Sequence, residues 1–171
     1  MSEAAENEMP EHDCQMAEPT AEHGALMELV GTWDVDCTYA MGPGEEMKVQ
    51  ATETVEAVGP FWTVSLFQSE MMGMPFSGRC TMGYDGNKGE WIATWVDSMQ
   101  PHLYVMRGNY DEAGKVLTMT SEGPAPGSGE MTTYRSTYES IEDGKRRMEM
   151  FVEMPGMGEV KMFSYIYTRA G

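Results

Sequence analysis

The sequence predicts an all-β protein, an antiparallel up-and-down barrel of about ten strands with one short N-terminal helix. Three observations lead to this fold class. From Thr32 onward, short segments rich in Val, Thr, Tyr, Phe and Trp follow one another along the chain. Clusters of Gly, Pro, Asp and Asn separate these segments and favour tight turns. Such a meander has two exposed edges, and closing into a barrel removes both.

The chain is expected to begin with a tail, residues 1–19 being disordered and acidic and residues 20–171 forming one barrel domain. Residues 1–19 contain six acidic residues and no Lys or Arg. Their few large apolar side chains bury too little surface to offset the entropy lost on ordering. The tail also gathers soft ligands that can hold copper(I), namely Met9, His12, Cys14 and Met16. Their spacing matches no defined site, so we predict no metal and no cofactor.

A single short helix is expected over residues 21–30. Thr20 offers a helix N-cap, because its side-chain oxygen can accept a hydrogen bond from the first turn. An apolar stripe at helical spacing consists of Leu26, Met27, Leu29 and Val30. Gly31 then supplies a C-terminal stop, so the helix should end directly before the first strand.

The predicted strands share enrichment in β-branched and aromatic residues and a spacing of about two between like side chains. In chain order they are WDVDCTYAM, MKVQATETVEAV, FWTVSLFQ, FSGRCTMGY, EWIATWVD, HLYVMRGNY, KVLTMT, EMTTYRSTYES, KRRMEMFVEM and EVKMFSYIYTR. Both faces of several strands carry mixed residues, so the sequence does not decide which face is interior.

Composition restricts the classes of function. The chain carries 28 acidic and 11 basic residues, a net charge of −17, and lacks the Lys and Arg clusters that bind nucleic acid. No apolar run approaches the ~20 residues that span a bilayer, and the acidic start is unlike a signal peptide. We therefore expect a cytoplasmic monomer or homodimer with no nucleic-acid partner and no membrane insertion. The 19 methionines suit either core packing or an adaptable pocket.

Two landmarks stand at the ends of the predicted barrel. Gly31-Thr32-Trp33 opens the first strand after the helix, and Arg169 ends the last one. This pair resembles the GxW motif and closing arginine of the calycin superfamily, which includes lipocalins and fatty-acid-binding proteins. The resemblance implies that Trp33 plugs one end of the barrel and that Arg169 lies across it in a cation–π contact. It also implies an interior that binds small apolar or amphipathic molecules, which is an argument from fold alone.

A series of short segments from about Glu22 to Arg169 gives a second resemblance. These segments are Glu22-His23, Leu29 to Trp33, Gly83-Tyr84-Asp85, Trp95 to Met99, Gly108 to Asp111, Glu122-Gly123-Pro124, Tyr134-Arg135 and Tyr167-Thr168-Arg169. In this order they resemble a bacterial family designated domain of unknown function 1579, itself calycin-like. Because the family has no established activity, the resemblance implies a fold and little chemistry.

An aromatic strand supplies the first candidate site. Alternation puts Trp91, Ala93, Trp95 and Asp97 on one strand face. The two tryptophans would form a stacking surface for a ligand, with Asp97 as a polar anchor. The competing interpretation is that the tryptophans are ordinary core and that Asp97 and Ser98 cap the following turn.

The next strand adds His102 and Tyr104 to this candidate site. His102 is the only histidine within the barrel strands and their turns, so it is the sole histidine there that could act as a general base. Asp97 and His102 are accordingly the candidate catalytic residues, should the barrel be an enzyme. No serine or cysteine motif accompanies them, which disfavours a nucleophilic triad.

Arginines within strands supply a second candidate site. If Arg79 and Arg135 point inward, they would form a carboxylate clamp with Tyr165 or Tyr167, because the guanidinium fork matches a carboxylate. The competing interpretation is that both arginines lie outside and pair with the many acidic residues.

The sequence thus supports three functional hypotheses. The first is a binding protein for a small apolar or amphipathic anion, held by the clamp and by Trp95 and Tyr104. The second is a lipocalin-type enzyme in which Asp97 or His102 transfers a proton, signalled by a buried ionisable group facing a pocket. The third is a packed barrel that binds protein through its outer surface.

Overall fold

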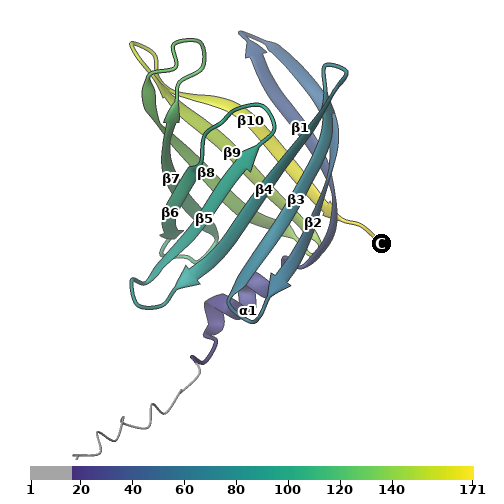
Figure 1. The fold of residues 1–171 in the computed structure, drawn as a ribbon, viewed down its shortest axis with the longest axis vertical. Helices are drawn as coiled ribbons and strands as arrows, with labels where there is room; N and C mark the ends of the chain where they lie inside the picture. Colours follow the sequence, from purple (N-terminus) through teal and green to yellow (C-terminus); the bar gives the residue numbers. More distant parts are fainter. Residues whose placement is uncertain (1–16) are drawn as a thin grey trace, which may run out of the picture.

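The computed structural model describes residues 17–171, which form a closed ten-stranded antiparallel barrel (Figure 1). The strands are β1 (Gly31–Gly42), β2 (Glu45–Val58), β3 (Trp62–Met71), β4 (Met74–Asp85), β5 (Glu90–Asp97), β6 (Tyr104–Tyr110), β7 (Val116–Pro124), β8 (Met131–Glu142), β9 (Lys145–Met154) and β10 (Gly158–Arg169). Each strand pairs with its neighbours in sequence, and β1 pairs with β10 to close the barrel. The predicted fold class is confirmed.

The period-two pattern of β1 shows why these segments form strands with one face inside. Trp33, Val35 and Cys37 are buried, whereas Asp34 and Asp36 between them are exposed. Successive side chains of a strand point to opposite faces, so the acidic residues remain in water while the apolar ones line the interior.

Helix α1 (Ala21–Met27) is shorter than the expected span of residues 21–30. It begins after Thr20, whose backbone N–H donates to His23 Nδ1 at 2.9 Å. Beyond Met27 the chain tightens into i→i+3 hydrogen bonds, from Leu29 N to Leu26 O and from Val30 N to Met27 O. Arg169 Nη1 then donates to Val30 O at 2.9 Å. These contacts turn the chain into β1, and they end the helix before Gly31.

Helix α1 covers one end of the barrel, at the bottom of Figure 1. Leu26 is fully buried. The ring of His23 lies edge-on to Phe61, with 5.1 Å between centroids, and its Nε2 is 3.2 Å from Tyr84 O. Trp33 Nε1 donates to Leu29 O at 2.8 Å, which ties the turn after the helix to the first strand.

The two ends of the barrel therefore differ. The turns β2–β3, β4–β5, β6–β7 and β8–β9 lie at the end with α1, which we call the closed end. The hairpins β1–β2, β3–β4, β5–β6, β7–β8 and β9–β10 surround the opposite, open end. Residues 1–16 of the predicted tail, which include its four copper(I) ligands, lie outside the described residues.

Two glycine substitutions test how tightly the barrel wall is packed. A Cβ at Gly108 would lie 1.8 Å from the carbonyl oxygen of Thr118, so Gly108→Ala must displace backbone. We expect it to lower the free energy of unfolding by about 2–3 kcal/mol in urea denaturation. Gly24→Ala is the control, because Gly24 lies exposed in α1 with nothing within 4 Å of its Cβ position. This change should raise stability by up to about 1 kcal/mol. Equal stability of the two variants would contradict the close approach of the β6 and β7 backbones at Gly108.

Candidate functional site

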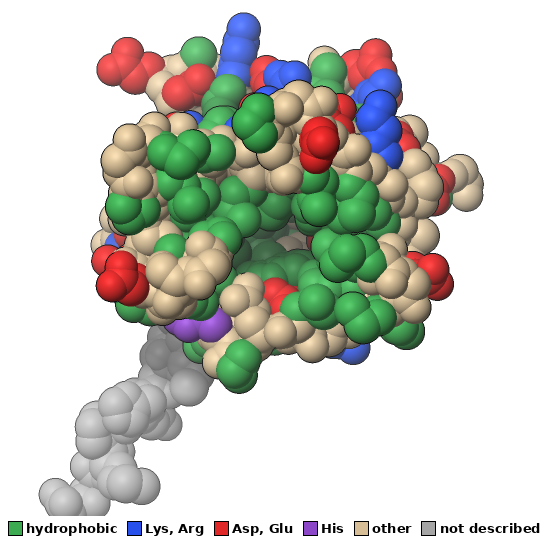
Figure 2. Space-filling view, turned by 90° about the horizontal axis from the view of Figure 1, so that it is seen from above, with side chains coloured by type: hydrophobic (Ala, Val, Ile, Leu, Met, Phe, Trp, Pro, Cys, Tyr) green, Lys and Arg blue, Asp and Glu red, His purple; other side chains and the backbone are tan. Residues whose placement is uncertain are grey.

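The interior of the barrel holds a cavity of about 840 Å³ that opens at the mouth formed by the open-end hairpins. Figure 2 looks into this mouth and shows a hollow surrounded by hydrophobic side chains. The aromatic residues lining the cavity are Trp33, Tyr39, Phe76, Trp91, Trp95, Tyr104, Tyr110, Tyr134, Tyr138, Phe163, Tyr165 and Tyr167. The methionines are Met71, Met82, Met99, Met106, Met148, Met150 and Met162. The wall thus combines rigid rings with adaptable thioethers.

Glycines on the inward face make room for some of these rings. A Cβ at Gly78 would lie 2.2 Å from the Trp95 ring, and one at Gly123 would lie 2.2 Å from the Tyr104 ring. Both rings therefore lie flat against the wall, on a neighbouring strand's backbone. This packing keeps two large side chains out of the centre of the barrel and leaves the cavity open.

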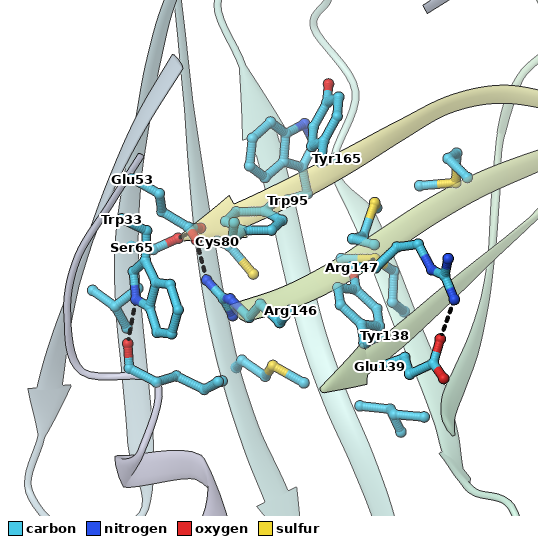
Figure 3. Close-up of a pocket in the computed structure, with 18 of the residues that line it drawn as sticks. Trp33, Glu53, Ser65, Cys80, Trp95, Tyr138, Glu139, Arg146, Arg147 and Tyr165 are labelled. Carbon is cyan, nitrogen blue, oxygen red and sulfur yellow. Dashed lines mark hydrogen bonds and ion pairs between the residues drawn. The ribbon is translucent and has the colours of Figure 1, made fainter. Parts of the chain in front are cut away.

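A charged group lies inside this aromatic wall (Figure 3). Arg146 Nη2 donates to Glu53 Oε2 at 2.5 Å, and Ser65 Oγ donates to Glu53 Oε1 at 2.8 Å. The guanidinium carbon of Arg146 lies 4.5 Å from the centroid of the Trp33 ring and 4.3 Å from that of Tyr167. Arg146 Nε is buried without a hydrogen-bond partner, which leaves one donor of the guanidinium group unsatisfied.

The strand register places these groups together. Arg146 lies on β9 directly opposite Tyr167 of β10, and Trp33 of β1 is paired with both Arg169 and Glu53. Arg146 shares its inward phase with Met148, and its neighbour Arg147 pairs with Glu139 at the border of the same cavity (Figure 3). The Arg146–Glu53 pair, with 17% and 10% of its side chains exposed, is the more deeply buried of the two.

Burial keeps a cysteine and two tyrosines of the wall neutral. It raises the pKa of the Cys80 thiol to about 12, and the negative charge of Glu53 adds to this effect. Burial likewise raises the pKa of Tyr167 and of Tyr138 well above the usual range for a phenol. These groups therefore remain protonated at neutral pH, the tyrosines serve as hydrogen-bond donors, and the thiol is not a nucleophile.

The structure brings five of the predicted site residues to the cavity, namely Trp95, Asp97, Tyr104, Tyr165 and Tyr167. Asp97 is held in a turn, as the competing interpretation expected. Its carboxylate accepts hydrogen bonds from Trp95 Nε1 at 3.0 Å and from the backbone N–H groups of Met99 and Gln100 at 2.8 and 3.2 Å. Ser98 Oγ accepts from the backbone N–H of Ser77.

His102 lies beside the cavity rather than within its lining. Its ring packs edge-on against Tyr104, with 4.6 Å between centroids, and its Nε2 is 3.1 Å from the carbonyl oxygen of Glu122. The aromatic contact places the imidazole behind the tyrosine ring that faces the cavity.

The two arginines of the expected clamp face outward. Arg79 is exposed, because the neighbouring residues Gly78 and Cys80 take the inward phase of β4. Arg135 donates from Nε and Nη2 to the two carboxylate oxygens of Glu159, both at 2.6 Å, and lies over the Phe151 ring. Neither arginine meets Tyr165 or Tyr167. Arg146, which the sequence did not single out, occupies the inward position instead.

Trp33 and Arg169 take the places that the resemblance implies. The guanidinium carbon of Arg169 lies 4.3 Å from the centroid of the Trp33 ring.

Within residues 17–171, no group of three or more His, Cys, Asp and Glu side chains is placed to hold a metal ion. In the same part of the chain, no helix has the length and apolar character needed to cross a membrane.

Comparisons with solved structures support the barrel architecture. Rv2717c from M. tuberculosis, known from a crystal structure, superposes with a TM-score of 0.68 at 16% identity, over 90% of this chain and 100% of that chain. The S-type phycobiliprotein lyase CPES from Guillardia theta superposes with a TM-score of 0.58 at 10% identity, over 90% of this chain and 99% of that one. At such identities the likeness shows the fold alone.

Sequence comparisons give the family. No curated protein matches the chain significantly. The family model described as "Protein of unknown function (DUF1579)" matches residues 18–169, nearly all of the described chain. This match confirms the resemblance inferred from the motifs, and the protein belongs to the DUF1579 family.

Proposed function

We propose that this protein binds one small amphipathic molecule inside its barrel. The observation that carries the proposal is the unfilled cavity of about 840 Å³, closed at one end by α1 and open at the other. Sites for drug-sized ligands have volumes of about 300–1,000 Å³ and combine an apolar wall with a few placed polar groups. The cavity also argues against the third sequence-based hypothesis, because a packed scaffold would leave no such space.

The Arg146–Glu53 pair is the anchor for the polar end of the ligand. Arg146 lines the cavity, and its guanidinium group suits an oxygen acceptor such as a carbonyl, a hydroxyl or a carboxylate. The anionic ligand expected from the sequence has less support, because Arg79 and Arg135 face outward and Glu53 already neutralises Arg146. An uncharged head group with an acceptor oxygen avoids burying a second negative charge beside Glu53.

The geometry gives less support to the hypothesis that the barrel is an enzyme. Asp97 already accepts three hydrogen bonds in its turn, and His102 stands behind Tyr104. The carboxylate of Asp97 is thus already engaged and the imidazole of His102 lies outside the cavity lining, so the geometry gives proton transfer less support.

Binding can be tested by filling the cavity. The fluorescent amine N-phenyl-1-naphthylamine, which is uncharged at neutral pH, should bind the full-length protein with one site per chain. Met150→Trp places a larger side chain into the space that Met150 lines, and we expect it to weaken binding about tenfold or more, a loss of about 1.4 kcal/mol.

Val105→Trp is the matched control, because Val105 points outward and is 40% exposed. Its affinity should equal that of the unmodified protein. Equal weakening by the two substitutions, or no binding by the unmodified protein, would argue against an interior site.

The anchor can be tested by removing its charges singly and together. Arg146→Met leaves Glu53 buried without its partner, and breaking such a pair costs about 3–5 kcal/mol of unfolding free energy. The double variant Arg146→Met/Glu53→Gln should recover most of this loss in urea denaturation. Arg147→Met breaks a more exposed pair with Glu139 and should cost less than about 1 kcal/mol.

The double variant also separates the ligand classes. Displacement of the fluorescent probe by dodecanol and by dodecanoate compares an uncharged head group with an anionic one on the same chain. The unmodified protein should prefer dodecanol, and the double variant should bind dodecanol more weakly because it lacks the guanidinium donor. Preference of the unmodified protein for dodecanoate would refute the neutral head group while leaving the interior site intact.

A further inference from the structure

Every hairpin at the open end carries an exposed methionine. We call this set the methionine rim: Met41, Met72, Met74, Met99, Met131 and Met157. Each of these side chains is at least half exposed. Figure 2 shows hydrophobic side chains gathered around the mouth. The turns at the closed end, within residues 59–61, 86–89, 111–115 and 143–144, contain no methionine. The exposed methionines therefore mark one end of the molecule.

The backbone of the β3–β4 hairpin shows that turn formation does not account for methionine there. Met72 and Gly73 form the turn, with φ values of +50° and +78°. Positive φ at both central positions favours Asn, Asp or Gly, and a residue of another type in this region costs of order 1 kcal/mol. Met72 is 70% exposed, so no packing within the barrel offsets this cost. The residue suits an external contact better than it suits its own turn.

Prolines stiffen the backbone that presents the rim. Each open-end hairpin contains one, at Pro43, Pro75, Pro101, Pro126 and Pro155. A fixed φ at these positions lowers the backbone entropy that a partner would have to remove on binding. The rim thus combines restrained tips with unbranched, polarizable side chains, a combination suited to partners of varied shape.

The charge around the rim selects the class of partner. The five hairpin segments, residues 41–46, 70–75, 97–103, 125–131 and 154–159, contain no Lys or Arg. Their acidic residues are Glu45, Glu46, Glu70, Asp97, Glu130 and Glu159, of which Glu159 is paired with Arg135 and Asp97 is held in its turn. This charge repels anionic lipid head groups and complements Lys and Arg side chains.

We propose that the methionine rim is a docking surface for a basic amphipathic polypeptide segment. The apolar side chains of the segment would lie among the rim methionines, and its Lys and Arg side chains would pair with the surrounding carboxylates. A large exposed apolar patch rimmed by polar groups is typical of an interaction site. The proposal goes beyond ligand binding, because it concerns the outer surface, and a partner seated there covers the mouth of the cavity.

The test uses full-length protein labelled with ¹³C at the methionine methyl groups and three synthetic helical peptides. One peptide combines Leu and Lys on opposite faces, one replaces Leu by Ser, and one replaces Lys by Glu. The Leu/Lys peptide should bind about tenfold or more tightly than either control, because docking needs both apolar area and charge complementarity. Its affinity should fall as the salt concentration rises. Methyl shifts should be largest for the rim methionines and small for the buried Met106 and Met119.

Two matched variants locate the surface. Met41→Gln/Met72→Gln/Met131→Gln/Met157→Gln removes apolar side chains that do not line the cavity, and it should weaken the Leu/Lys peptide about tenfold. Val58→Gln/Ile141→Gln changes exposed apolar residues near the closed end, 54% and 44% exposed, and should leave the affinity unchanged. Both variants should bind N-phenyl-1-naphthylamine like the unmodified protein, which separates this test from that of the cavity.

Several outcomes would overturn the proposal. If the peptide with Ser in place of Leu bound as tightly as the Leu/Lys peptide, charge alone would drive association. If the peptide with Glu in place of Lys did so, apolar area alone would drive it. Equal weakening by the closed-end variant, or methyl shifts outside the rim, would place the contact elsewhere. Rim shifts on adding phosphatidylcholine vesicles, without any preference among the peptides, would assign the rim to a lipid surface instead.

Discussion

The stack of charged and aromatic groups around Trp33 is the interaction on which the rest of the structure depends. The guanidinium groups of Arg146 and Arg169 lie over its ring, while its indole N–H donates to Leu29 in the turn that follows α1. Because Trp33 lies on β1 opposite Arg169 of β10, the stack forms at the seam where the barrel closes. The same contacts therefore close the barrel, position the helix and hold one cation inside the cavity.

Much of the fold could be predicted from the sequence because strand formation here is signalled locally. Alternation of side chains and turn residues at short intervals gave ten strands, and the ends of the chain gave Trp33 and Arg169. The predicted helix was too long because the chain after Met27 is positioned by a distant residue, Arg169, which donates to the carbonyl oxygen of Val30. A single-sequence pattern carries no signal for such a contact.

The site was less predictable, because a barrel strand has two faces and the sequence left their assignment open. Arg79 and Arg135 stood among small polar residues that fit either face, and both proved to lie outside. Arg146 was hidden in a run of three basic residues that resembles a solvated surface. Its phase with Met148 was a usable signal, since residues two apart in a strand share a face.

The exposure of the rim also has a chemical consequence for the molecule. A thioether is oxidised to a sulfoxide by peroxides, and the reaction turns an apolar side chain into a polar one. The sulfur atoms at the hairpin tips meet such oxidants before those of Met106 and Met119, which the wall of the barrel shields. Oxidative damage would thus accumulate first on the methionine rim at the open end and make it more polar, while the interior packing that maintains the barrel is spared.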